Sequence, residues 1–278
     1  MTNEKDSNSG YAQINGVRLY YEIDGEGSDL VFVHAGCADH RMWAEQISAF
    51  AHDHKVLCYD MRGYGRSTIS TSTFSNRDDL YDLLETLGIQ QGHFVACSMG
   101  SFTVTDFALE YPEKVQSLVL VSPALSGYQY QGQPPKPVLE MIDARKAGHL
   151  EHAAELQAQI WADGPKRNLN ESNREVHELV RQMSLDSLKL QAYIIRETAF
   201  LIEEPLNPPA MERLEQFNIP TLVIVGDLDD DSEMAIAEVL TTRIKGAQKA
   251  IMRGTAHLPN IEKPEEFNQI VLEFLKKI

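Results

Sequence analysis

The sequence predicts an α/β fold built on a doubly wound, mostly parallel sheet. Short, continuous apolar runs cover residues 30–33, 55–59, 118–121 and 221–225, as expected of strands that are buried on both faces. Segments with the apolar spacing of helices lie between these runs, and this alternation is typical of parallel sheets. In such sheets the functional loops follow the carboxyl ends of the strands.

The individual elements have local signals. Asn15-Gly16 separates runs at 11–14 and 17–23 and predicts a β-hairpin. Pro264, followed by Glu265 and Glu266, suits the start of the last helix. The remaining elements are expected as helices at 42–50, 76–87, 99–110 and 233–244, a strand at 93–97 and a short strand at 250–252.

The alternation of strands and helices stops after residue 125. Apolar residues with helical spacing cover 138–142, 176–183 and 190–201, and no convincing strand interrupts them. We therefore predict two parts in the chain. Residues 1–125 and 213–278 form the α/β core, and residues 126–212 form a helical lid over the carboxyl edge of the sheet.

Composition and charge limit the possible functions. The chain has 278 residues, of which 43% are apolar, and this allows a sizeable core. The net charge of -16 disfavours partners such as nucleic acid or an anionic membrane. Residues 1–10 do not resemble a signal peptide, and no apolar run approaches the roughly 18 residues of a membrane span. Cys37, Cys58 and Cys97 are odd in number, and we expect buried, reduced thiols in a cytoplasmic protein.

A serine follows the strand expected at residues 93–97. Residues 96–100 read Ala-Cys-Ser-Met-Gly, which is close to the Gly-x-Ser-x-Gly pattern of a nucleophile elbow. Small residues two before and two after Ser98 fit this geometry, because strand and helix pack closely there. A serine after a strand is usually the N-cap of a helix, so the motif alone is not specific for catalysis.

Two further residues complete a pattern with Ser98. Asp229 follows the strand at 221–225, and His257 follows the last predicted strand. Taken singly, His257 could be a surface histidine and Asp229 a solvated turn residue. His34 is best interpreted as a histidine whose hydrogen bonds are satisfied in the core. Three chemically matched residues, each after a strand, nevertheless favour a catalytic triad in the order Ser, Asp, His.

With these motifs the chain resembles the α/β-hydrolase family, in the branch of small esterases, lactonases, haloperoxidase-like enzymes and C–C hydrolases. The resemblance covers nearly the whole chain outside the lid, although Ala35 and Ala96 stand where the family usually has glycine. Serine at position 98 argues against the epoxide hydrolases and haloalkane dehalogenases of this fold, which use aspartate. The matching segments are His34-Ala35-Gly36, Asp60-Met61-Arg62-Gly63-Tyr64-Gly65-Arg66-Ser67, the elbow, Gly226-x-x-Asp229 and Gly254-x-x-His257.

The resemblance implies that Ser98 is the nucleophile, that His257 accepts its proton and that Asp229 orients His257. Asp227 is the alternative acid. No cofactor or metal is expected, and Asp60 and Arg62 are expected to fix a turn. The resemblance places the backbone N–H groups of Gly36 and Met99 in the oxyanion hole, with that of Cys37 as the alternative.

The substrate is less well determined by the sequence. Similar lids direct a tryptophan toward the pocket, so Trp161 is the candidate substrate-binding residue, although it could instead pack the lid. The lid has no cluster of Lys and Arg for phosphorylated or CoA-bearing substrates. We predict a carboxylesterase that cleaves a small, uncharged ester. A lactonase, a C–C hydrolase or a slow-turnover ligand-binding signalling module is the alternative, and the oligomeric state is not predicted.

Overall fold

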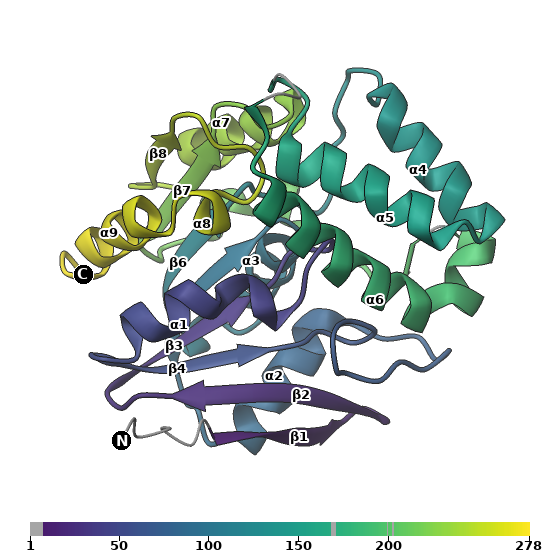
Figure 1. Ribbon diagram of the computed structural model, residues 1–278. Coiled ribbons are helices and arrows are strands. Elements are labelled where there is room, and N and C mark those ends of the chain that lie inside the picture. The colour runs from purple at the N-terminus through teal and green to yellow at the C-terminus, as the bar shows by residue number, and fades with distance from the viewer. Residues whose placement is uncertain (1–7, 168–170, 199, 202) are drawn as a thin grey trace, which may run out of the picture.

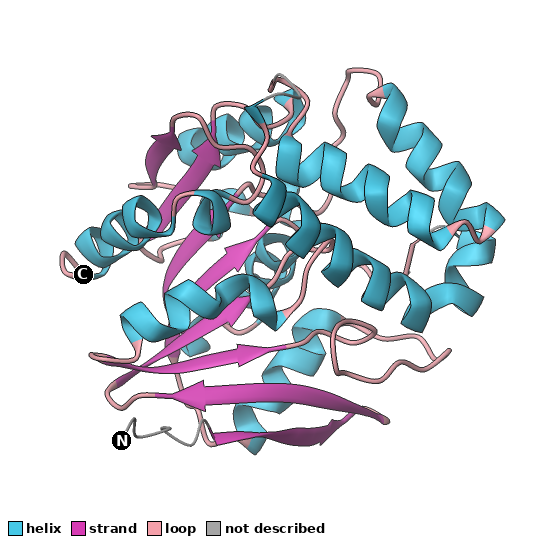
Figure 2. Cartoon of the chain, in the orientation of Figure 1, coloured by secondary structure: helices cyan, strands magenta, loops and turns pink. Residues whose placement is uncertain are grey.

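The computed structural model describes residues 8–167, 171–198, 200–201 and 203–278. Within them, eight strands form one sheet in the order β1-β2-β4-β3-β5-β6-β7-β8 (Figures 1 and 2). β2 pairs antiparallel with β1 and β4, and the other neighbouring pairs are parallel. This confirms the predicted fold class. The strands are β1 (Asn8–Ile14), β2 (Val17–Asp24), β3 (Ser28–Val33), β4 (His54–Tyr59), β5 (Gly92–Cys97), β6 (Val115–Val121), β7 (Thr221–Gly226) and β8 (Gln248–Met252).

Helices cover both faces of the sheet (Figure 1). In β3, Val31 and Val33 pack on one face while Leu30 and Phe32 pack on the other, because successive side chains of a strand point in opposite directions. Both faces of the central strands are therefore buried. The first face packs against α2 (Asn76–Thr86), α3 (Met99–Glu110) and α7 (Asp231–Arg243), and the second against α1 (Ala44–Phe50) and α9 (Pro264–Leu275).

The strand order reverses direction at β3. The chain runs from β3 to β4 on one side and then crosses to β5 on the other side. The loops after β3 and β5 consequently diverge and leave a crevice at their carboxyl ends, where ligands bind in open α/β sheets. Ser98 follows β5, and the segment from His34 to Gly36 follows β3.

A group of helices lies beyond this edge of the sheet. α4 (Lys136–Ala147), α5 (Leu150–Ala158) and α6 (Arg174–Thr198) pack around Met141, Leu156 and Leu188. Figure 2 shows the central strands pointing toward this group. The stripes predicted at 176–183 and 190–201 belong to one 25-residue helix, because no glycine or proline interrupts residues 174–198. Leu201, the last residue of the second stripe, lies beyond the end of this helix.

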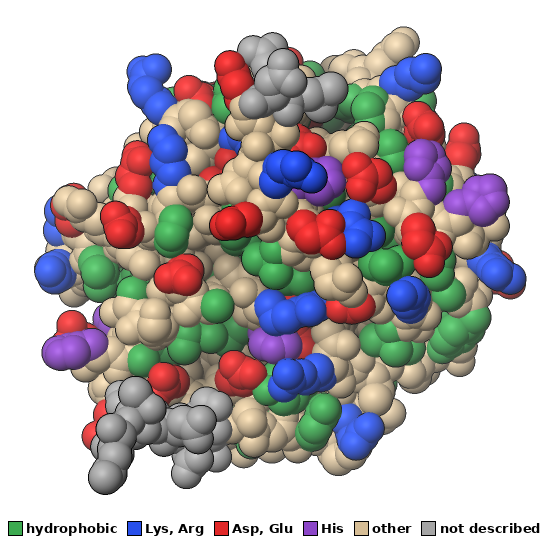
Figure 3. All heavy atoms as spheres, viewed as in Figure 1, with side chains coloured by type: hydrophobic (Ala, Val, Ile, Leu, Met, Phe, Trp, Pro, Cys, Tyr) green, Lys and Arg blue, Asp and Glu red, His purple; other side chains and the backbone are tan. Residues whose placement is uncertain are grey.

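The surface is mixed in character. On the face drawn in Figure 3, acidic and basic side chains are interspersed with small hydrophobic groups. Among the residues that the structure describes, no helix combines the length and the apolar character needed to cross a membrane.

Candidate active site

Ser98 lies on a sharp turn between β5 and α3. Its backbone angles, φ 53° and ψ -116°, fall in a region that residues other than glycine rarely adopt, and its N–H donates to the Val121 carbonyl at 2.9 Å. Gly100 explains the need for a small residue after the turn, because a Cβ there would lie 2.4 Å from the Val33 carbonyl oxygen. Ala96, on the strand side, is completely buried. The turn thus has the strained geometry of a nucleophile elbow.

His257 and Asp229 meet at the ends of two neighbouring strands. The Nδ1–H of His257 donates to both carboxylate oxygens of Asp229, at 3.0 and 3.1 Å, and both residues are 1% exposed. Asp229 Oδ1 also accepts the backbone N–H of Asp230 at 2.9 Å. His257 Nε2 is buried and has no hydrogen-bond partner among the described residues. A nitrogen in this state can accept a proton from a nucleophile.

The other aspartates of this loop have different contacts. Asp227 Oδ1 accepts the backbone N–H of Gly254 at 2.6 Å and so ties the loop after β7 to the loop after β8. Asp230 caps α7 by accepting the N–H of Ser232 at 2.9 Å. Asp231 pairs with Lys166 at 2.8 Å. In the described part of the chain, Asp229 is therefore the aspartate of this loop that contacts the ring of His257.

The charge on His257 is controlled by its surroundings. Burial disfavours the imidazolium, but the charge and hydrogen bond of Asp229, together with the charges of Glu233 and Asp230, raise the pKa of His257 above its usual value. Burial also raises the pKa of Glu233, the third residue of α7. Sequence reasoning did not identify Glu233, because an acidic residue in the first turn of a helix is common and is normally explained by the helix dipole.

Gly36 and Met99 lie next to each other at the crevice. A Cβ on Gly36 would lie 3.4 Å from Met99 Sδ, and the Gly36 N–H has no hydrogen bond among the described residues. Met99 is the first residue of α3, so its N–H has no acceptor within the helix. Two unpaired backbone donors beside the nucleophile elbow could stabilise a developing oxyanion.

His34 supports the loop that presents Gly36. Its Nδ1 lies 2.8 Å from the Ala35 carbonyl oxygen, and its Nε2 accepts the backbone N–H of Met61 at 2.9 Å. The ring is therefore a neutral tautomer, and burial lowers its pKa. This matches the interpretation of His34 as a satisfied core histidine.

Trp161 lies beside His257. Their ring centroids are 6.2 Å apart, with the planes inclined at 46°. Trp161 belongs to a one-turn π-helix, Gln159–Asp163, which ends at Gly164. Short π-helical turns often occur at functional sites. The side chain is half-buried and contacts both the sheet core and the helical group, so it lies where the two parts of the molecule meet.

The three cysteines are free thiols in the interior. Cys97 immediately precedes Ser98, and its sulfur lies 3.7 Å from the carbonyl oxygen of His257. Burial raises the pKa of Cys97 well above its usual value and that of Cys37 to about 12. The protonated thiol is a poor nucleophile, so these residues are unsuited to the chemistry of Ser98.

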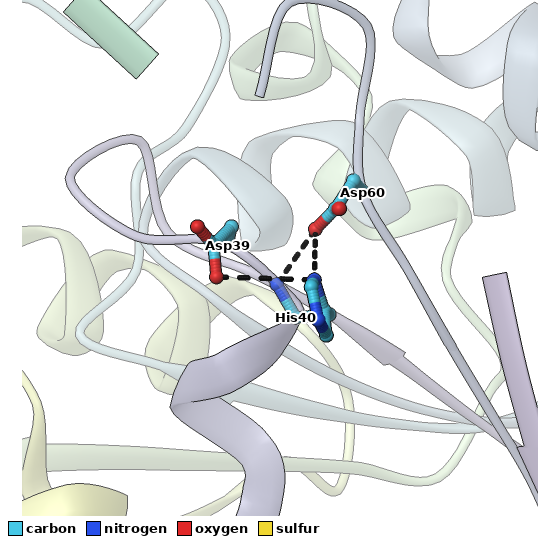
Figure 4. Close-up of side chains that lie close together, drawn as sticks. All are labelled: Asp39, His40 and Asp60. Atoms are coloured by element: carbon cyan, nitrogen blue, oxygen red, sulfur yellow. Dashed lines mark hydrogen bonds and ion pairs between the residues drawn. The ribbon is translucent and has the colours of Figure 1, made fainter. Parts of the chain in front are cut away.

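A second polar cluster, Asp39, His40 and Asp60, has side-chain atoms close enough to bind a metal ion (Figure 4). Protein donors occupy these atoms. Asp60 accepts the backbone N–H and Nδ1–H of His40, each at 2.8 Å, and the N–H of Arg66 at 2.8 Å. Asp39 accepts the Arg41 guanidinium at 2.6 Å. Burial opposes the imidazolium of His40, but Asp60 and Asp39 raise its pKa. The cluster therefore carries its own cations and is best explained as a structural network.

Arg62 is also structural. It forms a buried, bidentate pair with Asp79, with both N···O distances at 2.8 Å. This pair joins the loop after β4 to α2, which agrees with the expectation that Asp60 and Arg62 fix a turn.

Comparisons with known proteins place this chain in a family. The model of the alpha/beta hydrolase fold matches residues 30–264. The chain is 27% identical to 3-oxoadipate enol-lactonase 1 of Acinetobacter baylyi over 95% of both chains. It is 27% identical to the 2-hydroxy-6-oxononadienedioate/2-hydroxy-6-oxononatrienedioate hydrolase of Burkholderia vietnamiensis, over 94% of this chain and 92% of that protein.

A third relative has a solved structure with the same fold. The carboxylesterase YbfK of Bacillus subtilis is 24% identical over 90% of this chain and 81% of that protein. Its crystal structure superposes with a TM-score of 0.76 and covers 97% of this chain and 92% of that chain, at 21% identity. The relatives thus include esterases, enol-lactonases and C–C hydrolases. From the family match over residues 30–264 and the shared architecture, the chain belongs to the alpha/beta hydrolase fold family.

Proposed function

We propose that this chain is a serine hydrolase that cleaves a small carboxylic ester through an acyl-enzyme intermediate. The observation that carries the proposal is the buried His257, which donates to Asp229 through Nδ1 and leaves Nε2 unpaired. The backbone of His257 lies beside the elbow, since its carbonyl oxygen is 3.7 Å from the sulfur of Cys97, the residue before Ser98. An imidazole in this state is ready to accept the proton of Ser98. Metal chemistry and redox chemistry are not required for such a reaction.

The proposed reaction has two halves. Ser98 Oγ attacks the ester carbonyl carbon while its proton moves to His257 Nε2, and Asp229 stabilises the imidazolium. The tetrahedral oxyanion accepts hydrogen bonds from the N–H groups of Gly36 and Met99. When the C–O bond breaks, the proton passes from His257 to the leaving alcohol. Water then attacks the acyl-enzyme by the same route and releases the carboxylic acid and free Ser98.

Cleavage of a lactone is the second candidate. It uses the same triad, because a lactone is a cyclic ester whose alcohol stays attached to the acyl group. The observation that favours it is the 27% identity to an enol-lactonase along nearly the whole chain. The position of Trp161 beside His257 supports a pocket role for this side chain with either substrate.

Turnover on a panel of 4-nitrophenyl esters and simple lactones tests the proposal. We expect many turnovers per enzyme molecule, labelling of Ser98 by a fluorophosphonate, and a loss of about 10³-fold or more in kcat for Ser98→Ala. The variant should keep its circular dichroism spectrum and melting temperature. Near wild-type activity of purified Ser98→Ala would refute the proposal, and a single slow turnover with tight binding would indicate a ligand-binding signalling module instead.

A further inference from the structure

Arg145 occupies a position where a helix normally carries an apolar residue. Met141, which is buried, and Val138 and Ile142, which are partly buried, form the apolar stripe of α4. Residue 145 continues this stripe, because it lies seven, four and three positions after Val138, Met141 and Ile142. Arg145 is only 4% exposed. This charge at an apolar position is visible in the sequence, but only the structure shows that its guanidinium is turned inward.

The guanidinium has few partners. Among the described residues, Nη2 donates to Gln191 Oε1 at 3.5 Å, Nη1 approaches Met141 Sδ at 3.9 Å, and Nε has no hydrogen-bond partner. The Phe200 ring lies 4.5 Å from the guanidinium carbon. No described carboxylate forms an ion pair with Arg145. Burial lowers its pKa, and the neighbouring Tyr64 opposes this only in part.

This arrangement is unusual in energetic terms. Arginine offers five N–H donors, and a buried charge is normally paired with an anion because leaving it unpaired is costly. Arg62 shows the usual solution in this protein, since its buried guanidinium is held by the Asp79 carboxylate. A cation–π contact with Phe200 offsets part of the cost for Arg145 but satisfies none of its N–H groups in their plane. The site of Arg145 therefore lacks an anion.

Arg145 is connected to the proposed oxyanion hole. Gln191, its hydrogen-bond partner, donates to the Gly63 carbonyl at 2.9 Å. The next residue, Tyr64, contacts Gln191 and places its hydroxyl 3.5 Å from Met99 Sδ. A cavity of about 80 Å³ is lined by Tyr64, Met99 and Phe200. Arg145 does not line this cavity itself but adjoins it through its contact with the Phe200 ring.

One acidic residue, Glu203, also lines this cavity. Its carboxylate accepts the backbone N–H of Asn76 at 2.8 Å and forms no ion pair with Arg145. Burial raises the pKa of Glu203. Because its carboxylate is held by Asn76 and not by Arg145, Glu203 does not supply the missing anion.

We propose that Arg145 binds a carboxylate carried by the substrate, so that the substrate is a half-ester of a dicarboxylic acid or a lactone with a free carboxylate. This inference rests on the proposed function and replaces the sequence-based expectation of an uncharged ester. The carboxylate accepts the unpaired Nε–H and an Nη–H in the forked geometry that arginine provides. The ester group then lies toward Met99 and Ser98.

The test compares two series of methyl esters in a pH-stat at neutral pH. The first contains monomethyl succinate, glutarate and adipate, and the second contains the neutral methyl esters of the matching monocarboxylic acids. We expect wild-type kcat/KM to favour at least one half-ester over its neutral partner. In Arg145→Gln the ratio of kcat/KM for the half-ester to kcat/KM for its neutral partner should fall about 10- to 100-fold, because the variant loses a charge-assisted hydrogen-bonded pair. Arg145→Lys should show a smaller fall, because it keeps the charge but not the fork.

The control is Lys146→Gln, which removes the same charge from the next, exposed residue of α4 and should leave the ratio unchanged.

Binding without turnover gives a second measurement. Adipate should raise the melting temperature of the wild type more than hexanoate does, and this difference should disappear in Arg145→Gln. If Arg145→Gln does not fold, Arg145→Lys and the wild-type shift with adipate decide the question.

The two proposals fail in different ways. If the wild type hydrolyses both series equally and Arg145→Gln slows both equally, the carboxylate site is wrong and the serine hydrolase remains. If no ester is cleaved and Ser98 is not labelled, but adipate still stabilises the protein through Arg145, the anion site stands and the proposed reaction is wrong.

Discussion

The indole of Trp161 lies 6.2 Å from the imidazole of His257, measured between ring centroids. The first ring comes from a π-helical turn in the helical segment, and the second from the loop after β8. A group in the predicted lid thus covers the proposed general base. This contact provides a route by which the helical segment can select substrates without taking part in the chemistry.

Trp161→Ala should change the order of preference among acyl groups. Removing the indole enlarges the space beside His257, so the kcat/KM of esters with longer acyl chains should rise relative to that of the acetate ester. We expect a change of roughly 10-fold, which is the order of magnitude for a difference of one methylene group in a pocket. Relative kcat/KM over a series of 4-nitrophenyl esters measures this. Tyr193→Ala, on an exposed lid aromatic, is the control and should leave the order unchanged. An equal loss on every ester would count against a pocket role.

Asp229→Asn should reduce kcat by roughly 10⁴-fold, as the equivalent change does in a serine protease, because the amide no longer holds the required tautomer of His257. Asp227→Asn is the matched control. Its Oδ1 accepts a backbone N–H from Gly254, and asparagine keeps that acceptor, so its effect should be small. Steady-state kinetics of the two purified variants would decide between the acids. A severe loss in Asp227→Asn with an active Asp229→Asn would reverse the assignment.

The pH dependence of kcat/KM should report the ionisation of His257. The neutral imidazole is the base, so activity should rise with pH through a midpoint above 6.5, the usual value, because nearby carboxylates raise the pKa. Glu233→Gln removes one of these charges and should move the midpoint to lower pH. Glu238→Gln, on the exposed side of the same helix, is the control. Identical midpoints in all three proteins would argue against the influence of Glu233.

Asp106→Asn should stabilise the protein at alkaline pH. Burial raises the pKa of Asp106 to about 6, although its hydrogen bond from Ser126 at 2.6 Å opposes the shift. Because the folded-state pKa exceeds the unfolded value, the contribution to stability is complete below about pH 4 and is lost as the pH rises through about 6. Asparagine keeps the acceptor for Ser126 without the charge.

The gain at pH 8 should therefore reach up to about 3 kcal/mol and vanish near pH 4. Melting temperatures of wild type and variant between pH 4 and pH 8 measure it, with the exposed Asp143→Asn as control. A gain that did not depend on pH would point to a cause other than ionisation.

Removal of divalent cations should leave hydrolysis unchanged. The oxygens of Asp39 and Asp60 accept hydrogen bonds from protein donors, so a cation would have to displace these donors. Activity after dialysis against EDTA, compared with a mock-dialysed sample, is the measurement. Inactivation by EDTA that a divalent cation reverses would show that the cluster in Figure 4 is a metal centre after all.

Much of the architecture could be predicted from the sequence because its causes are local. The Asn15-Gly16 turn needs positive φ at both residues, and the structure has 45° and 82° there. The run at 30–33 alternates between two buried faces, so it could only be an interior strand. The small residues around Ser98 reflect contacts made within one strand, one turn and one helix.

The helical segment was harder to predict because packing determines its boundaries. Two apolar stripes are parts of one helix, α6, and the small-residue helix α5 had no strong periodic signal. α5 is stabilised by its contacts with α4 and α6, where Ala153 and Ala154 allow close approach. Secondary-structure preferences are weak compared with such packing.

The sequence by itself determined which strand ends carry the candidate groups Ser98, Asp229 and His257. The reason is that short segments of sequence are enough to identify each strand and the turn that follows it. Only the tertiary structure decided that Asp229 meets His257 while Asp227 holds Gly254, and that Arg145 turns into the interior without an anion. These facts depend on distances between side chains far apart in sequence. Such distances arise when the whole sheet and its helices pack, and no local pattern encodes them.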